Sequence, residues 1–113
     1  HENFAELLAA YPDAPFFYAS TKAPRSYAQA EYPRDVFLVF GRESRGLPEN
    51  LLERVYDRCI RIPMIEGARS LNLSNSVAIV TYEALRQHGF EHLLDHGALT
   101  GRDEEPGAWM DYL

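Results

Sequence analysis

The sequence predicts an α/β protein with a mostly parallel sheet and helices on both faces of that sheet. Residues 36–40 form an unbroken apolar run, which is typical of a strand covered on both faces. Short apolar segments alternate along the chain with segments of helical period, the pattern that joins parallel strands. The longest helical segment, residues 72–88, follows the last of three predicted strands. The predicted order is therefore helix, strand, loop, strand, helix, strand, helix.

The first third of the chain predicts a short helix, a strand and a polar loop. Asn3 followed three positions later by Glu6 matches a capping box, so we expect a helix from residue 3 to about residue 11. Residues 16–21 are rich in aromatic side chains and too few for a helix, and they predict a strand. Residues 22–35 are polar and contain two prolines, which predicts a loop with room for one short turn of helix.

The middle of the chain predicts two further strands around a helix. We expect residues 36–40 to be the central strand of the sheet, because the run is apolar on both faces. A loop over residues 41–46 follows, and Pro48 then introduces a helix over residues 49–56, since proline is tolerated where a helix begins. Residues 59–64 predict the third strand, which is short and contains a proline near its end.

The helix predicted over residues 72–88 is apolar on two faces. One face carries Leu73, Val77, Val80 and Ala84. Ile79 and Tyr82 lie on a different face, so we expect this helix to pack once on the sheet and once on a partner chain. Gly89 ends the helix, and the acidic tail over residues 91–113 is expected to be peripheral.

Length and composition predict one globular domain. The 113 residues suit a single core, and the hydrophobic share of 46% with a charged share of 25% excludes a disordered or fibrous chain. Neither a signal peptide nor a membrane-spanning stretch is recognisable, so we expect no membrane partner. A single cysteine, Cys59, provides no disulfide framework, and we expect a reducing, cytoplasmic location.

The charge distribution directs attention to the middle of the chain. The net charge is −6, yet six of the eleven basic residues fall within residues 41–70, and all six are arginines. Arginine suits bidentate contact with phosphate, so a local patch for RNA is compatible with an acidic protein. The alternative is that these arginines form exposed ion pairs: Arg54 and Arg58 along their helix, and Arg45 with Glu43 or Glu49.

The three loops that follow the predicted strands are the expected site, because parallel sheets bind ligands at the carboxyl ends of their strands. The loop over residues 41–48 carries two glycines but lacks the patterns of a phosphate-binding loop or a dinucleotide fold. Residues 69–76 contain more serine and asparagine than capping one helix requires. This excess indicates a ligand or a tight turn.

Other common chemistries have little support in the sequence. His88, His92 and His96 recur every four residues, but Gly89 interrupts their helix, so we expect no metal. Cys59 lies in a strand predicted to be buried, where a thiol is usually inert. The Gly-x-Ser-x-Gly elbow of serine hydrolases does not occur in the sequence.

Three stretches of the chain closely resemble the motifs of the SPOUT RNA methyltransferases. They read FGRESRGLP over residues 40–48, IRIPM over 60–64 and RSLNLSNSVA over 69–78. The likeness extends from about residue 16 to residue 90, and it is strongest to the 2′-O-methyltransferases that modify the wobble nucleotide, position 34, of tRNA. The resemblance implies a SPOUT-like fold with a C-terminal trefoil knot, a homodimer and the cofactor S-adenosylmethionine.

The resemblance also implies roles for individual residues. The cofactor would be bound by Ala19, Thr21, Gly41, Ile62, Met64, Ser70 and Leu71, with Gly41 providing close approach of the backbone to the ligand. RNA phosphates would contact Lys22, Arg42, Arg45 and Arg69. Ser70, Asn72 and Glu43 would take part in catalysis by orienting the attacking hydroxyl or its activating arginine.

The resemblance departs from the family pattern at the start of the chain. The family begins with a strand–helix unit bearing an Asn-x-Gly-x-x-Arg motif, and residues 1–113 lack it. We expect the natural protein to carry this unit, because Glu43 and Asn72, the expected partners of its arginine, are present. A non-catalytic domain that binds cofactor or RNA, and a 2′-O-methyltransferase acting on another tRNA or rRNA site, remain the alternatives.

Overall fold

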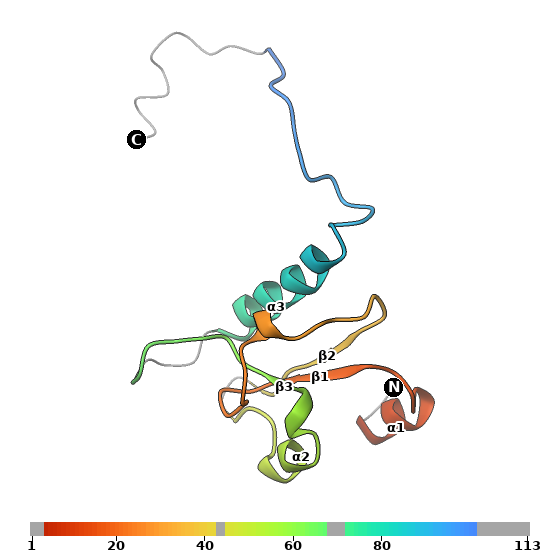
Figure 1. Cartoon of the computed structure of the whole chain (residues 1–113), viewed down its shortest axis with the longest axis vertical. Coiled ribbons are helices and arrows are strands. Elements are labelled where there is room, and N and C mark those ends of the chain that lie inside the picture. The colour runs from red at the N-terminus through yellow and green to blue at the C-terminus, as the bar shows by residue number, and fades with distance from the viewer. Residues whose placement is uncertain (1–3, 43–44, 68–71, 102–113) are drawn as a thin grey trace.

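The computed structural model describes residues 4–42, 45–67 and 72–101 (Figure 1). The elements are α1 (Phe4–Ala10), β1 (Phe16–Ala19), the 3₁₀ turn η1 (Tyr27–Gln29), β2 (Phe37–Val39), α2 (Glu49–Arg54), the 3₁₀ turn η2 (Tyr56–Arg58), β3 (Cys59–Ile60) and α3 (Leu73–Gln87). Strands and helices alternate as predicted, and the α/β fold class is confirmed.

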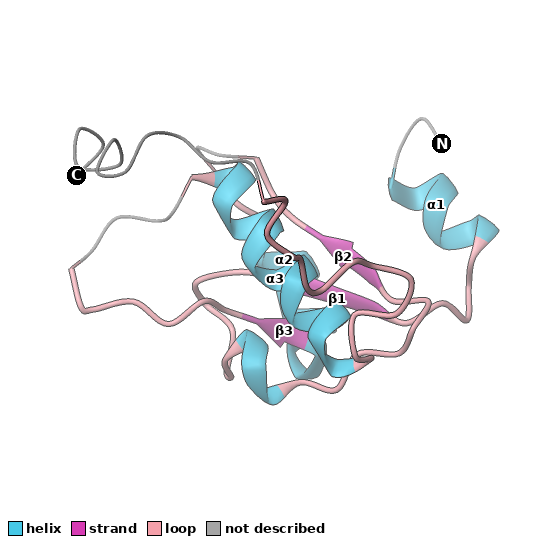
Figure 2. Cartoon of the chain, turned by 90° about the horizontal axis from the view of Figure 1, so that it is seen from above, coloured by secondary structure: helices cyan, strands magenta, loops and turns pink. Residues whose placement is uncertain are grey.

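The three strands form one parallel sheet in the order β2-β1-β3 (Figure 2). β1 lies in the middle and pairs Phe16 with Phe37 of β2 and Tyr18 with Cys59 of β3. The prediction that residues 36–40 form the central strand is therefore wrong for the strands that the structure describes. An apolar run indicates that both faces of a strand are covered, which holds for β2, but it does not distinguish a central strand from its neighbour.

Helices cover both faces of the sheet, as predicted: α3 lies on one face, and α1 and α2 lie on the other (Figure 1). Successive residues of β1 point to opposite faces, so Phe17 joins one core while Phe16 and Tyr18 join the other. The core beneath α3 contains Phe17, Ala30, Tyr32, Ile60, Val80 and Ala84. The opposite core contains Phe16, Tyr18, Leu52, Val55 and Cys59.

The polar segment over residues 22–35 contributes to the core more than its composition predicts. It does form a loop with one 3₁₀ turn, but Ala30 and Tyr32 are only 2% and 3% exposed. Gln87 of α3 holds this loop in place, because its side chain accepts a hydrogen bond from the Tyr32 backbone N–H (2.9 Å) and donates one to the Ala30 carbonyl (2.8 Å). α3 is thereby fixed against the sheet.

A glycine cap ends α3 within one residue of the predicted boundary. The backbone N–H of Gly89 donates to the carbonyl of Arg86, and that of Phe90 donates to the carbonyl of Leu85, both at 3.0 Å. These two bonds form the Schellman pattern, which requires a left-handed residue after the helix. Gly89 adopts that conformation with φ of 71°.

The buried face of α3 differs by one position from the predicted face. Val80 and Ala84 are buried and Leu73 is half-buried, as expected, but Val77 is 38% exposed. Ser76 takes its place and is half-buried. Positions 76 and 77 both border the face centred on Val80. The prediction chose Val77 because its side chain is apolar, whereas Ser76 is the residue that turns toward the core.

Three other elements end at least two residues earlier than predicted, and β1 is one of them, since it ends at Ala19 instead of residue 21. β3 ends at Ile60 instead of residue 64, and Arg61 continues it only as a single parallel bridge to Ser26. α2 ends at Arg54 and gives way to η2. Residues 91–101 contain neither helix nor strand and run away from the sheet (Figure 1). No described helix has the length and apolar character needed to cross a bilayer.

Candidate functional site

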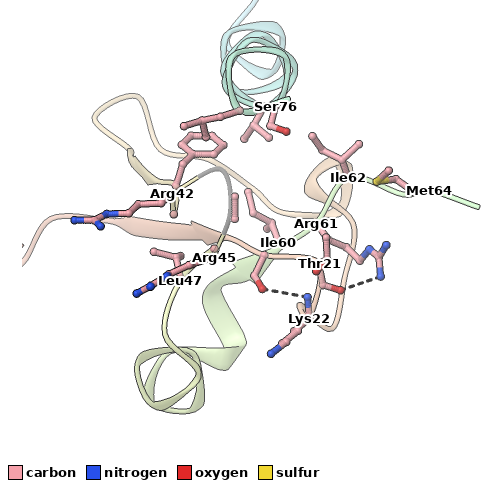
Figure 3. Close-up of a pocket in the computed structure, with 17 residues that line it drawn as sticks. Thr21, Lys22, Arg42, Arg45, Leu47, Ile60, Arg61, Ile62, Met64 and Ser76 are labelled. Carbon is pink, nitrogen blue, oxygen red and sulfur yellow. Dashed lines mark hydrogen bonds between the residues drawn. The ribbon is translucent and has the colours of Figure 1, made fainter. Parts of the chain in front are cut away.

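The loops that leave the three strands meet the start of α3 around a cavity of about 270 Å³ (Figure 3). The cavity lies at the carboxyl ends of the strands, where parallel sheets bind ligands. Its wall comprises residues 19–22, 40–42, 45–47 and 60–62 with Met64, and Leu73, Ser76 and Val80 of α3. The buried side chains of Ile60 and Val80 form an apolar floor, while the loops provide polar backbone groups.

The residues that the resemblance assigns to a cofactor are brought together here as far as they are described. The cavity is lined by Ala19, Thr21, Gly41, Ile62 and Met64, which come from all three loops. Ser70 and Leu71 lie outside the described residues.

Basic side chains surround the same cavity. Lys22, Arg42 and Arg45, predicted to contact phosphate, line it, and so does Arg61, while the described part of its wall contains no aspartate or glutamate. Figure 3 shows Arg42 and Arg45 on the side opposite Met64. Arg69 lies outside the described residues.

Steric contact shapes the loop after β2. A Cβ atom on Gly41 would lie only 2.5 Å from the Gly46 carbonyl oxygen and the Leu47 backbone nitrogen, and closer still to the Gly46 carbonyl carbon. The backbone N–H of Gly46 donates to the Arg42 carbonyl at 2.9 Å, which closes the loop on itself. The loop therefore requires a residue without a side chain at position 41. The expectation that Gly41 provides close approach of the backbone to a ligand is incomplete, because the glycine is also needed by the loop itself.

Hydrogen bonds fix the loop after β1. The Ser20 N–H donates to the Ile60 carbonyl (2.9 Å), and the Ala23 N–H donates to the Ser20 carbonyl (3.1 Å), which closes a turn over residues 20–23. Arg61 donates from Nη1 to the Thr21 carbonyl at 3.0 Å (Figure 3). The turn is thus tied to the end of β3.

One of the predicted phosphate contacts has an acidic partner. Lys22 Nζ lies 2.7 Å from Glu49 Oε2 at the start of α2, and the side chains are 59% and 70% exposed. The hydrogen bond and the charge of Lys22 hold the pKa of the Glu49 carboxyl below its usual value. Glu49 therefore does not serve Arg45, and within the described residues neither Arg42 nor Arg45 forms an ion pair.

The described part of the chain does not show the ion pairs that the alternative predicts for the arginines of the second predicted helix. Among the residues that the structure describes, Arg54 and Arg58 form no salt bridge with the acidic residues of their helix. That alternative is unsupported for these two side chains.

The predicted catalytic residues are only partly visible. Asn72 caps α3, because its side chain accepts a hydrogen bond from the Ser74 N–H at 2.8 Å. Glu43 and Ser70 lie outside the described residues. The described chain contains no cluster of three histidine, cysteine, aspartate or glutamate side chains arranged to hold a metal ion.

Sequence reasoning missed several lining residues, each with a signal that could have found it. Leu73, Ser76 and Val80 recur at helical spacing on one face of α3. Ser76 belongs to the serine- and asparagine-rich stretch that indicated a ligand, but that signal did not single it out as a lining residue. Phe40 ends the run that contains β2, so the carboxyl-edge rule already placed it at the site. Arg61 belongs to the arginine cluster and to the IRIPM stretch, but its bond to Thr21 had no local signal, because Thr21 is forty positions away in the sequence.

Comparison with known families identifies the motif-bearing part of the chain. The SpoU rRNA Methylase family matches residues 1–82. A curated relative from Bacillus subtilis (strain 168) is 44% identical over 96 residues, covering 82% of this chain and 60% of the relative. A relative from Escherichia coli (strain K12), named tRNA (cytidine(34)-2′-O)-methyltransferase, is 38% identical over 91 residues, covering 80% of this chain and 58% of the relative. The chain thus spans less than two thirds of the length of these relatives.

Solved structures agree with the sequence relatives. A structure described as giving insight into 2′-OH methylation of C/U34 on tRNA is 41% identical, with a TM-score of 0.72 over 80% of this chain and 59% of its own. The SpoU methyltransferase AviRb from Streptomyces viridochromogenes, in complex with its cofactor AdoMet, is 26% identical, with a TM-score of 0.60 over 76% of this chain and 34% of its own.

Proposed function

The chain belongs to the SpoU rRNA methylase family. We propose that it forms part of an S-adenosylmethionine-dependent methyltransferase that modifies the ribose 2′-hydroxyl of the wobble nucleotide of tRNA. The observation that carries this proposal is one cavity in which the described cofactor residues and the described basic residues meet. The names of relatives that act on cytidine 34 of tRNA support the choice of substrate.

The wall of the cavity suits S-adenosylmethionine. Ile62 and Met64 line the cavity and would flank the adenine ring, and the buried side chains of Ile60 and Val80 belong to the same wall. When bound, the cofactor supplies an electrophilic methyl group on a sulfonium. The residues that we propose hold it are Ala19, Thr21, Gly41, Ile62, Met64, Ser70 and Leu71.

The basic residues around the cavity suit an RNA backbone. We assign phosphate contacts to Lys22, Arg42, Arg45 and Arg69, because cations beside a methyl-donor pocket can hold the ribose of a target nucleotide near the donor. The absence of acidic side chains from the described wall supports this assignment. An overall acidic protein can bind RNA in this way through one local patch.

The attacking 2′-hydroxyl must lose its proton, and this chain contributes polar groups around it. We assign this orienting role to Ser70, Asn72 and Glu43, as the resemblance implies. Asn72 lies directly before the lining residue Leu73, and this proximity to the cavity supports a positioning role.

We further propose a homodimer, a trefoil knot in the C-terminal part and a cytoplasmic location, the compartment of tRNA modification. The exposure of Val77 (38%) and Tyr82 (60%) on the outer surface of α3 supports an interface there. Sedimentation at micromolar concentration should give a dimer for the wild type and a lower association constant for Tyr82→Glu. A wild-type monomer would contradict the proposed interface.

Methyl mapping tests the proposed function directly. The protein is incubated with S-adenosylmethionine and transcribed tRNA, and ribose methylation is located by mass spectrometry of nuclease digests. We expect one 2′-O-methyl group at nucleotide 34. Methylation at a different tRNA or rRNA position would favour the alternative substrate, and binding of both ligands without transfer would favour a non-catalytic domain.

A further inference from the structure

The ion pair between Lys22 and Glu49 stands at the edge of the basic cavity. Lys22 lines the cavity, whereas Glu49 begins α2 and is absent from the lining. Their atoms Nζ and Oε2 are 2.7 Å apart, the distance of a charge-assisted hydrogen bond. Among the described residues, Lys22 is the basic side chain of the wall that forms an ion pair, whereas Arg42, Arg45 and Arg61 form none.

The backbone beneath Lys22 is braced at two successive carbonyls. Arg61 Nη1 donates to the carbonyl of Thr21, and the Tyr56 hydroxyl donates to the carbonyl of Lys22, both at 3.0 Å. The Lys22 N–H itself donates to Ser20 Oγ at 3.1 Å. The turn is therefore held in place independently of Glu49, so that only the flexible end of the Lys22 side chain needs to move when its partner changes.

We propose that the Glu49 carboxylate occupies the place of an RNA phosphate on Lys22 in the RNA-free protein, and that the two anions exchange when RNA binds. This inference rests on the proposed function. Both anions offer a charged oxygen acceptor to the same ammonium group. Glu49 thereby sets how tightly the site binds RNA, since each binding event must first break the pair.

The exposure of the pair makes this exchange inexpensive. Both side chains are more than half exposed, and an exposed ion pair is weak because water competes for each partner. The Glu49 carboxyl is ionised at neutral pH, since its pKa is lowered further from a value that is already acidic, so the competition operates under physiological conditions. A modest effect on affinity is expected, with no effect on the cavity itself.

The experiment measures the affinity of a transcribed tRNA as a function of salt for four variants. We expect Glu49→Gln to bind about two- to fivefold more tightly than wild type, as the loss of a weak competing pair predicts. Lys22→Ala should bind more weakly, with a slope of log affinity against log salt that is shallower by roughly 0.7 to 0.9. In the Lys22→Ala background, Glu49→Gln should have no further effect.

Glu53→Gln is the matched control. Glu53 lies one turn further along α2, is exposed and has the same charge, but among the described residues it forms no ion pair with Lys22. A gain for Glu49→Gln that exceeds the gain for Glu53→Gln supports the exchange. An equal gain, or a gain that persists without Lys22, overturns it.

Melting temperature and methyl transfer separate the remaining explanations. If Glu49→Gln lowers the melting temperature and fails to tighten tRNA binding, the pair is only a tether between the turn and α2, and the inference is overturned. If the wild type binds and methylates tRNA while the exchange fails, only the inference falls. If the wild type does not bind tRNA, both the inference and the proposed function are overturned.

Discussion

The loops after β1 and β2 line the same cavity but are held by different forces. The turn after β1 is fixed by polar contacts from distant residues, Arg61 and Tyr56 among them. The loop after β2 is held by the close approach of its own backbone at Gly41 and Gly46, and its arginines form no ion pair within the described chain. One loop depends on partners elsewhere in the fold, and the other depends on the absence of a side chain.

This difference separates two tasks at one site. A loop closed by hydrogen bonds within its own backbone leaves its charged side chains available to a ligand, which is compatible with the proposed RNA contacts of Arg42 and Arg45. A turn closed by hydrogen bonds presents fixed carbonyls and one adjustable ammonium, Lys22. Substitutions in the two loops should therefore fail in different ways, and the following predictions run from the largest expected effect to the smallest.

Gly41→Val should have the largest effect, because its side chain would overlap the backbone of Gly46 and Leu47. We expect a loss of about 1–3 kcal/mol in the free energy of unfolding, as for overpacked sites, together with the loss of S-adenosylmethionine binding. Denaturant unfolding and calorimetry measure the two effects.

Gly46→Ala is the control for the conformational part of that loss. A Cβ atom on Gly46 meets open space, and its φ of +66° alone costs roughly 1–2 kcal/mol in a residue with a side chain. Cofactor binding should survive in Gly46→Ala. Normal unfolding and normal cofactor affinity in Gly41→Val would refute the steric account of this loop.

Arg61→Met should weaken the turn after β1 without disturbing the loop after β2. Loss of the bond to the Thr21 carbonyl is expected to lower S-adenosylmethionine affinity by a few-fold, in line with about 1 kcal/mol for one hydrogen bond. Calorimetry on this variant, on Arg61→Lys and on Arg58→Met distinguishes the bond from a general charge effect. Arg58 forms no salt bridge within the described chain, so equal losses at positions 58 and 61 would argue against bracing.

Arg45→Ala should affect RNA and leave the cofactor alone. We expect weaker tRNA binding and a salt slope shallower by roughly one unit, with nearly unchanged S-adenosylmethionine affinity. Fluorescence anisotropy at several salt concentrations provides the slope. If the triple variant Arg42→Ala, Arg45→Ala, Arg69→Ala binds tRNA as wild type does, the RNA surface lies elsewhere.

Acid should release the Lys22 side chain from Glu49 while both loops keep their backbone contacts. The folded state lowers the pKa of Glu49, so the small contribution of the pair to stability is present above the carboxyl's ordinary pKa and is lost as pH falls through the lowered value. The free energy of unfolding should fall slightly in that acidic range in wild type relative to Glu49→Gln, whereas amide exchange of the turn should be the same in the two proteins. Faster exchange of the turn in wild type alone would show that Glu49 tethers the turn.

Local signals predicted the helices and strands well. α3 was placed within a residue because Asn72 and Gly89 cap it through contacts with their own neighbourhood. Strand order could not be read in the same way, since β1 and β2 are both apolar on both faces. The burial of Ala30 and Tyr32 was also hidden, because Gln87 of a distant helix creates it.

The position of the candidate site was more predictable than its construction. The rule that ligands gather at the carboxyl ends of parallel strands placed the three loops together before any distance was known. The brace from Arg61 to Thr21 and the overlap that forbids a side chain at Gly41 depend on three-dimensional contact. Sequence motifs therefore identified the loops of the candidate site, while the structure shows which contacts hold each loop in place.

Cys59 is a chemical probe of how often the core beneath α1 and α2 opens. Its thiol is 0% exposed in the core beneath α1 and α2, and burial raises its pKa, so the reactive thiolate is suppressed while the core stays closed. A thiol reagent can then modify the protein only during moments when that layer opens. Cys59 is the one cysteine of residues 1–113, so the labelling rate of this chain reports the opening of the layer beneath α1 and α2.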